Sequence, residues 1–252
     1  MRLDRLLSEC GVASRKEGAR AIRAGKVSVN GVPATRADQP VAPEADVILL
    51  SGKRVIYRQY VYIMLNKPDG YVSATEDGRE PVVTELLPAE YRKRGVFPCG
   101  RLDKHTLGLM LLTDDGQLAH QLLSPKNHVA KTYAFRVKFP LSDADIRQLE
   151  EGVDIGGYRT QPCRVCLSEP GKGTITITEG KYHQIKLMMQ AVHNQIQYLE
   201  RRTFGALTLD PALERGAWRE LTAEEIDALR SRKETDEKDA TQPIDERNPY
   251  HS

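Results

Sequence analysis

An aspartate between two basic residues is the strongest candidate for chemistry in this chain. Asp103 lies two residues after Arg101 and directly before Lys104, in a segment with glycines (residues 100–109) that leads into an apolar run. Nearby cations favour the ionised form of a carboxylate, and loops held by rigid strands often carry catalytic groups. Asp103 is therefore a candidate nucleophile or base. The alternative is a surface turn with a local ion pair.

Two cysteines in a Cys-x-x-Cys arrangement, Cys163 and Cys166, raise the question of a metal or redox site. A structural zinc site needs four ligands, and neither a second cysteine pair nor a closely spaced histidine pair lies nearby. We therefore expect both cysteines to be strand residues, with no metal bound. Four cysteines in 252 residues make no disulfide framework, which favours a cytoplasmic protein with reduced thiols.

The distribution of charge is more informative than its total. The formal net charge is only +2, but residues 1–58 contain eleven Lys or Arg against six Asp or Glu. Such an asymmetry indicates a polyanionic partner. No apolar run approaches the roughly 18 residues that a membrane helix needs, and the charged first residues predict no secretory signal.

The first sixty residues predict a helix, a second helix and a hairpin. Apolar residues at i, i+3, i+4 and i+7 indicate a short first helix, which Gly11 ends. Ser14 and Glu17 form a capping box at the start of the second helix, which runs to about Ala24. The Asn-Gly pair at residues 30–31 is a strong two-residue hairpin turn.

The second helix carries three cations at i, i+4 and i+7: Lys16, Arg20 and Arg23. This spacing stacks them on one face of the helix, and Arg15 and Lys26 extend the patch. Acidic partners at i+4 are scarce, so the face suits a phosphate backbone. A merely solvated helix face is the alternative.

The remainder of the chain mixes strands and helices without a regular βαβ alternation, which predicts an α+β domain with a mainly antiparallel mixed sheet flanked by helices. We expect strands at residues 61–65, 107–113, 132–139 and 174–178, and helices at 117–123, 142–150, 185–192 and from 222. A polar, basic connector at residues 51–60 puts a domain boundary near Arg58. The expected units are residues 1–58, 59–230 and a disordered, charged tail at 231–252.

Five short motifs run through the first unit: Arg2-Leu3-Asp4, Ser14-Arg15-Lys16, Ala21-Ile22, Gly25-Lys26-Val27 and Val29-Asn30-Gly31. Together they resemble the alpha-L RNA-binding domain first recognised in a small-subunit ribosomal protein. The resemblance implies that this unit holds RNA.

Four motifs follow in order: residues 66–70 (Asn-Lys-Pro-Asp-Gly), 100–116 (opening with Gly-Arg-Leu-Asp), 131–133 (Lys-Thr-Tyr) and 179–186 (ending with Tyr-His-Gln-Ile-Lys). They resemble the RluA/RsuA superfamily of pseudouridine synthases, and four ordered motifs are far more specific than one. The Tyr-His-Gln form and the attached alpha-L domain are similar to the RsuA type, and within it to the enzymes of 16S small-subunit rRNA. Leu187 and His193 depart from the pattern, where relatives often carry a basic residue and a glycine.

The resemblance implies site-specific isomerisation of uridine to pseudouridine. This reaction breaks the bond from uracil nitrogen to ribose, turns the base and rejoins it through a ring carbon. No electrons or phosphate are transferred, so we expect neither a cofactor nor a metal. By the same resemblance, Asp103 acts at the sugar as nucleophile or base. Tyr133 stacks on the extruded uracil, and Lys186 pairs with Asp103 and keeps it charged.

The expected partner is ribosomal RNA or a pre-ribosomal particle, bound by a monomer. The expected RNA-binding residues are Arg2, Arg15, Lys16, Arg20, Arg23, Lys26, Arg101, Lys131 and His183. A basic run at residues 91–95 either contacts RNA or is a solvated loop. Two other functions stay open: a non-catalytic RNA-binding ribosome-assembly factor, and a synthase acting on 23S rRNA or tRNA.

Overall fold

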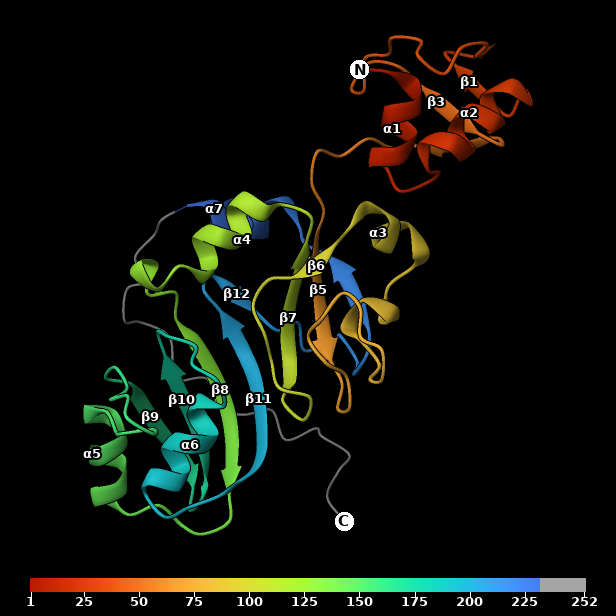
Figure 1. Ribbon diagram of the computed structural model, residues 1–252. Coiled ribbons are helices and arrows are strands. Elements are labelled where there is room, and N and C mark those ends of the chain that lie inside the picture. The colour runs from red at the N-terminus through yellow and green to blue at the C-terminus, as the bar shows by residue number, and fades with distance from the viewer. Residues whose placement is uncertain (232–252) are drawn as a thin grey trace.

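A computed structural model describes residues 1–231, so almost all of the expected tail (231–252) lies outside the described residues. Figure 1 shows a small N-terminal domain, from α1 to β4, joined by a short segment to a larger domain built on one long twisted sheet. Within residues 1–231, no helix combines the length and the apolar character that a bilayer crossing requires.

The N-terminal domain packs two helices against a four-stranded sheet. The helices are α1 (Leu3–Glu9) and α2 (Arg15–Arg23), and the strands are β1 (Val27–Val29), β2 (Val32–Pro33), β3 (Ile48–Leu50) and β4 (Lys53–Val55), in the order β2-β1-β3-β4. The capping box of Ser14 and Glu17 is present. Asn30 and Gly31 both have positive φ, as a tight hairpin turn requires. The predicted helix, helix and hairpin are confirmed.

The expected connector at residues 51–60 is partly wrong, because its first half belongs to the N-terminal sheet. Ser51 and Gly52 form a turn with positive φ, and β4 then pairs antiparallel with β3. Val55 is buried in the N-terminal core, while Lys53 and Arg54 are exposed. A three-residue strand with two exposed cations carries too little apolar signal to be recognised from sequence.

The larger domain has a nine-stranded sheet. Its strands are β5 (Tyr62–Lys67), β6 (Phe97–Pro98), β7 (Leu107–Thr113), β8 (Lys131–Val137), β9 (Arg164–Glu169), β10 (Lys172–Ile177), β11 (Ile196–Phe204), β12 (Leu207–Thr208) and β13 (Trp218–Glu220). The main order is β13-β5-β7-β11-β8-β10-β9, with β6 beside β7 and β12 beside β11. β7 and β11 run parallel and the other named pairs antiparallel, which confirms the expected α+β class.

Helices cover both faces of this sheet. They are α3 (Ala89–Arg94), α4 (Gly116–Leu123), α5 (Asp143–Glu151), α6 (Gln184–Ala191) and α7 (Ala223–Arg230), with 3-10 turns at Val83–Leu86 and Pro125–Asn127. The apolar stripe of α6 packs in one core cluster with alternate residues of β5 and β7. α4 and α7 pack with the intervening residues of the same strands. Because β7 is buried on both faces, its sequence is a continuous apolar run.

Two predicted boundaries differ. The strand expected at residues 132–139 leaves the sheet after Val137, because Asn194 bonds both backbone groups of Phe139. Of residues 91–95, expected as a loop or RNA contact, the first four belong to α3, and Gly95 caps the helix in a left-handed conformation. The helix expected at residues 142–150 is α5, with Ser142 as its cap.

Candidate active site

Asp103 lies on the loop that joins β6 to β7. The backbone N–H of Thr106 donates to the carbonyl of Asp103 (3.0 Å), which closes a turn around the carboxylate. After this turn, Gly108 has a φ of +97°, and a Cβ there would collide with the backbone of Arg201. Glycine at this position therefore permits the close parallel pairing of β7 with β11, which follows directly on the Asp103 loop.

Lys67 of β5 holds this loop through hydrogen bonds to its backbone carbonyls. Its side chain is fully buried, and Nζ donates to the carbonyls of Pro68 (3.1 Å), Lys104 (3.0 Å) and Thr106 (2.9 Å). Two of these carbonyls, those of Lys104 and Thr106, directly follow Asp103 in the chain, so one ammonium group ties the second half of the turn to β5. Burial lowers the pKa of Lys67 to about 8.

A serine holds the other approach to Asp103. The Ser73 hydroxyl donates to the carbonyl of Leu102 (2.7 Å) and accepts from the backbone N–H of the same residue (2.9 Å). The residue before the carboxylate is thus fixed by a reciprocal pair of hydrogen bonds. With Lys67, this contact restricts the backbone on both sides of Asp103.

Lys186, on the first turn of α6, reaches across to this loop. Its Nζ lies 2.7 Å from Oδ2 of Asp103, and both side chains are slightly more than one quarter exposed. His183 Nε2 is 3.6 Å from Oδ1, beyond a hydrogen bond. The result is a partly exposed carboxylate with one ammonium partner and a second basic group close by.

Tyr133, the third expected catalytic residue, is a buried residue of the sheet. It lies on β8, opposite Ile175 of β10 and Arg201 of β11, and is 7% exposed. It belongs to the same core cluster as Leu102 and Ile185, which neighbour Asp103 and Lys186 in the sequence. The fold therefore brings Asp103 and Lys186 into contact, from a loop and a helix, and places Tyr133 on a strand in the same core as their sequence neighbours. Their roles stay predictions.

The expected RNA-binding residues fall into two groups. Five are exposed on the N-terminal domain and have no ion-pair partner among residues 1–231: Arg15, Lys16, Arg20, Arg23 and Lys26. Arg2 is instead held by Asp4 in a two-pronged contact (2.8 and 3.0 Å). The remaining three, Arg101, Lys131 and His183, lie in the larger domain, apart from this basic patch.

These three differ in exposure. Arg101 is exposed, two residues from Asp103, and His183 stacks on the exposed ring of Tyr182 (3.8 Å between centroids). Lys131 is largely covered: its Nζ donates to the carbonyl of Val129 (2.9 Å), and burial lowers its pKa to about 8. Lys131 is therefore less available to RNA than the exposed Arg101.

Arg201 is a buried basic residue that the sequence patterns did not single out. It is 1% exposed; its Nε donates to the carbonyl of Leu109 (2.8 Å), and its guanidinium lies 4.9 Å from the Phe204 ring centroid. Its Nη2 has no hydrogen-bond partner in the part of the chain that the structure describes. In sequence it stands in a charged run that looks like a solvated strand end, so no local signal indicates burial.

Of the two departures from the family pattern, the one at His193 has a local explanation. His193 has a φ of +56°, a conformation that favours the glycine usual there in relatives. Asn194 is buried and holds Phe139. Of the two cysteines expected in a strand, Cys166 lies in β9, but the prediction is wrong for Cys163, which precedes β9 because its thiol donates to the carbonyl of Leu149. Over residues 1–231, no group of three or more His, Cys, Asp or Glu side chains is arranged to hold a metal ion.

This two-domain arrangement matches known families along its length. Residues 61–191 match the RNA pseudouridylate synthase family, and residues 1–47 match the S4 domain family. The chain belongs to the RNA pseudouridylate synthases. The resemblance stated from the motifs is confirmed, and with it an isomerase rather than a non-catalytic RNA-binding factor.

Relatives support this assignment over nearly full length. An RNA pseudouridine synthase of Bacillus subtilis is 48% identical over 91% of this chain and 98% of its own length. Ribosomal small subunit pseudouridine synthase A of Yersinia pestis is 41% identical (90% and 97%), and that of Escherichia coli K12 is 37% identical (90% and 98%). A crystal structure of a pseudouridylate synthase shares 34% identity and a TM-score of 0.64, over 91% of this chain and 99% of that one.

Proposed function

We propose that this enzyme converts one uridine of small-subunit ribosomal RNA to pseudouridine, with Asp103 as the group that acts at the ribose. The observation that carries the proposal is the contact of 2.7 Å between Asp103 and Lys186 on a partly exposed surface. The names of the relatives from Yersinia pestis and Escherichia coli support the choice of the small subunit.

The pairing of Asp103 with Lys186 meets the main chemical demand. A nucleophile at the sugar carbon or a base there needs a carboxylate held in a fixed position, and the Lys186 ammonium group at contact distance orients that of Asp103. The bond from uracil nitrogen to the sugar carbon breaks, the base turns, and a ring carbon forms the new bond. The proton on that ring carbon then moves to the nitrogen by way of a base or water, so the atoms balance without a co-reactant.

The other residues of the site position and enclose the base. Lys67 and Ser73 restrict the loop, so Asp103 does not have to be ordered when RNA binds. In this proposal, the small exposed part of Tyr133 contacts the uracil, and Arg101 takes a phosphate or fills the vacated stack. Lys131 adds positive charge at the floor of the site.

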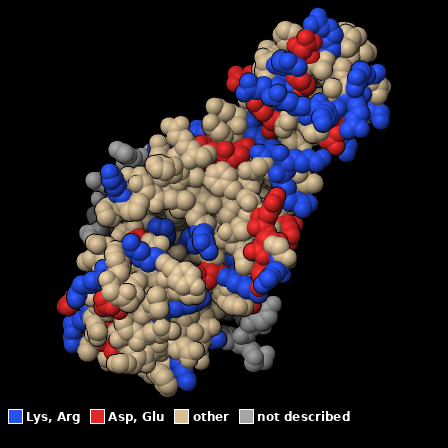
Figure 2. Space-filling model, viewed as in Figure 1, with Lys and Arg blue, Asp and Glu red and all other residues tan. Residues whose placement is uncertain are grey.

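The basic N-terminal domain helps to offset the cost of extruding the uridine. Extrusion from a stacked helix requires a few kcal/mol, and phosphate contacts supply sequence-independent binding energy. Figure 2 shows Lys and Arg atoms spread over the N-terminal domain, and more of them around a hollow in the larger domain. We assign residues 1–58 to RNA binding and 59–230 to catalysis, in a cytoplasmic monomer.

The experiment that tests this proposal compares wild type with Asp103→Asn on deproteinised small-subunit rRNA and on small ribosomal subunits. We expect the variant to form pseudouridine about 10³-fold more slowly or not at all, measured by mass spectrometry of nuclease fragments. Asp143→Asn, an exposed aspartate at the start of α5, is the matched control and should keep wild-type activity.

Unchanged activity in Asp103→Asn would overturn the assigned catalytic residue. A second measurement tests the substrate: total RNA from cells without this protein is mapped for missing pseudouridine. A missing position in 23S rRNA or tRNA, with small-subunit rRNA unchanged, would overturn the substrate while leaving the enzyme class intact.

A further inference from the structure

A cleft lies where the two domains meet, away from Asp103. It has a volume of about 520 Å³ and is lined on the N-terminal side by the end of α1 and the β3–β4 hairpin, and on the other side by α3 and Glu220. We call it the junction cleft. Its charged lining residues include Lys53, Arg54, Arg58, Glu90, Lys93 and Glu220.

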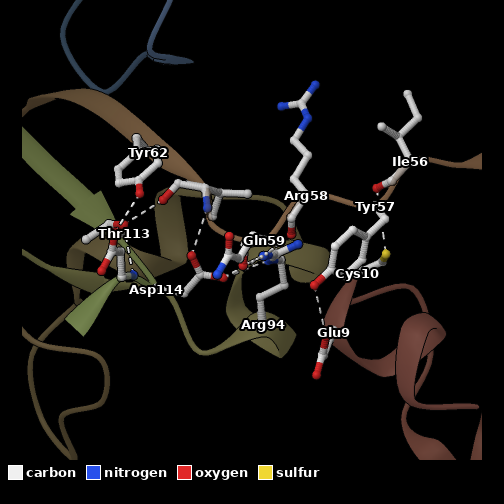
Figure 3. A network of polar contacts seen from close by, with 12 residues as sticks. Glu9, Cys10, Ile56, Tyr57, Arg58, Gln59, Tyr62, Arg94, Thr113 and Asp114 are labelled. Carbon is white, nitrogen blue, oxygen red and sulfur yellow. Dashed lines mark hydrogen bonds and ion pairs between the residues drawn. The ribbon is translucent and has the colours of Figure 1, made fainter. Parts of the chain in front are cut away.

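The larger domain fixes one wall of the junction cleft through Arg94 of α3. This side chain is only 6% exposed; it pairs with Asp114 (2.7 Å) and donates to the carbonyls of Arg58 (3.0 Å) and Gln59 (3.3 Å). The other oxygen of Asp114 accepts from the backbone N–H of Val61. Figure 3 shows how this network attaches the segment between the two domains, residues 56–60, to the larger domain. We call this segment the linker.

The N-terminal domain contacts the other end of the same linker through α1 and the residue after it. The Tyr57 hydroxyl contacts Glu9 (3.4 Å), and the Cys10 thiol lies 3.6 Å from the carbonyl of Ile56. A side chain at Gly11 would collide with the backbone of Glu90, so α1 and α3 approach closely there. The linker is therefore held at both ends, and the cleft exists before any ligand binds.

Charge in the junction cleft is mainly positive. Lys53, Arg54 and Lys93 are exposed and have no ion-pair partner within the described part of the chain. Glu220 is already engaged, by Arg58 and by the Tyr91 hydroxyl (2.8 Å). Among the residues that line the cleft, this leaves Glu90 as the carboxylate without an ion-pair partner in the described part of the chain, against three unpaired cations.

The junction cleft continues the basic patch of the N-terminal domain. The capping bonds from Ser14, and after them the charge of Lys93 on α3, lower the pKa of Glu17 on α2. Lys93 is therefore near the start of the helix that carries Arg20 and Arg23. Figure 2 shows Lys and Arg atoms running from the N-terminal domain along the junction toward the larger domain.

We propose that the junction cleft binds the phosphodiester backbone of the substrate RNA as it passes from the N-terminal domain to the catalytic domain. The inference rests on the proposed function. Unpaired, exposed cations on a preformed wall suit a chain of phosphates, which brings charge without requiring a particular sequence. The basic run on α3, open between two interpretations from sequence, is then an RNA contact.

The test compares Lys53→Ala/Lys93→Ala in the full chain with wild type. The probe is deproteinised small-subunit rRNA, and the dissociation constant is measured between about 50 and 200 mM salt. Removal of two phosphate contacts should weaken binding about tenfold at the low-salt end and reduce the slope of log affinity against log salt by about 1.4 to 1.8. The KM for pseudouridine formation should rise in parallel.

Two control variants keep the result specific. Lys138→Ala/Arg147→Ala removes two exposed cations near α5, at the far end of the sheet in Figure 1, and should bind as wild type. Lys53→Arg/Lys93→Arg preserves the charge and should restore binding. Melting temperatures of all variants verify that they fold.

An unchanged salt slope in Lys53→Ala/Lys93→Ala would overturn the proposal. So would a defect seen on ribosomal subunits but not on deproteinised rRNA, which would assign the cleft to a ribosomal protein. Failure of the proposed function is distinguishable, because wild type would then form no pseudouridine whatever the binding slope of the variant.

Discussion

Basic residues serve the two domains in different surroundings. On α2 of the N-terminal domain, Arg20 and Arg23 are exposed and lack carboxylate partners within residues 1–231. In the catalytic domain, Lys67 is fully buried against three carbonyls, and Lys186 is committed to Asp103. Basic side chains thus lie in water on α2 and against fixed partners around the Asp103 loop.

Positive charge therefore has two uses in this protein: exposed cations attract RNA phosphates, and buried cations hold backbone or carboxylate groups in place. An exposed, unpaired cation attracts phosphates over a Debye length, is screened by salt and tolerates small displacements. A buried cation is sensitive to displacement, because its hydrogen bonds are short and directional and its desolvation has to be offset locally. Substitutions should therefore affect salt-dependent binding in the first domain, and stability or turnover in the second.

The largest effect on stability is expected for Lys67→Met. Three carbonyls lose their donor, two of them on the loop of Asp103, so we expect the free energy of unfolding to fall by about 3 kcal/mol. Urea denaturation measures it. Lys104→Met is the matched control, since that lysine pairs with Glu80 at the surface (2.7 Å) and should change stability by less than about 1 kcal/mol. Equal effects would contradict the contrast between buried and exposed cations.

Lys186→Met should lower kcat about 100-fold, because the Asp103 carboxylate loses the ammonium group that holds it in position at 2.7 Å. KM should change little, since the defect lies in the reacting group. Lys186→Arg, which keeps the charge, should recover most of the turnover. Lys172→Met on β10, whose lysine pairs with Glu169, is the control. If the role of Lys186 were purely structural, Lys186→Met and Lys186→Arg would lower the melting temperature equally.

Reversal of the exposed patch, Arg20→Glu/Arg23→Glu, should weaken binding to rRNA about tenfold and flatten its salt dependence. Turnover at saturating RNA should fall far less than binding. Arg5→Glu/Arg36→Glu makes the same change in net charge, but at cations already paired with Glu9 and Asp38. If the two double variants behave alike, net charge rather than the α2 face governs binding.

The smallest effect is expected for Lys131→Met, and it depends on pH. Burial lowers the pKa of Lys131 from its ordinary value of 10.5, which applies to the unfolded chain, to about 8 in the folded protein. Between these two pH values the unfolded chain therefore binds more protons than the folded protein. Folding stability of wild type should rise with pH through that window. The Met variant should therefore be more stable by about 1 kcal/mol at pH 7, allowing for partial exposure, with the gap closing by pH 10. Urea denaturation at several pH values checks it.

Much of the local structure was predictable from sequence, because its signals act over a few residues. The capping boxes, the Asn-Gly hairpin and the apolar strand at residues 107–113 appear where expected. The four ordered motifs, among them the one around Asp103, identified the family without any coordinates. The sequence signal failed at β4, where a short polar strand depends on pairing with β3 rather than on its own pattern.

The sequence by itself determined the elements, the enzyme family and the candidate acid, since these depend on local patterns and on residue types in order. Only the tertiary structure decided which cations are buried. Lys67 finds its acceptors 37 and 39 residues away, and Arg201 is enclosed by strands from elsewhere in the chain. The junction cleft likewise arises from segments on both sides of the linker. Burial of a charge depends on which distant backbone groups surround it, and no local pattern records that.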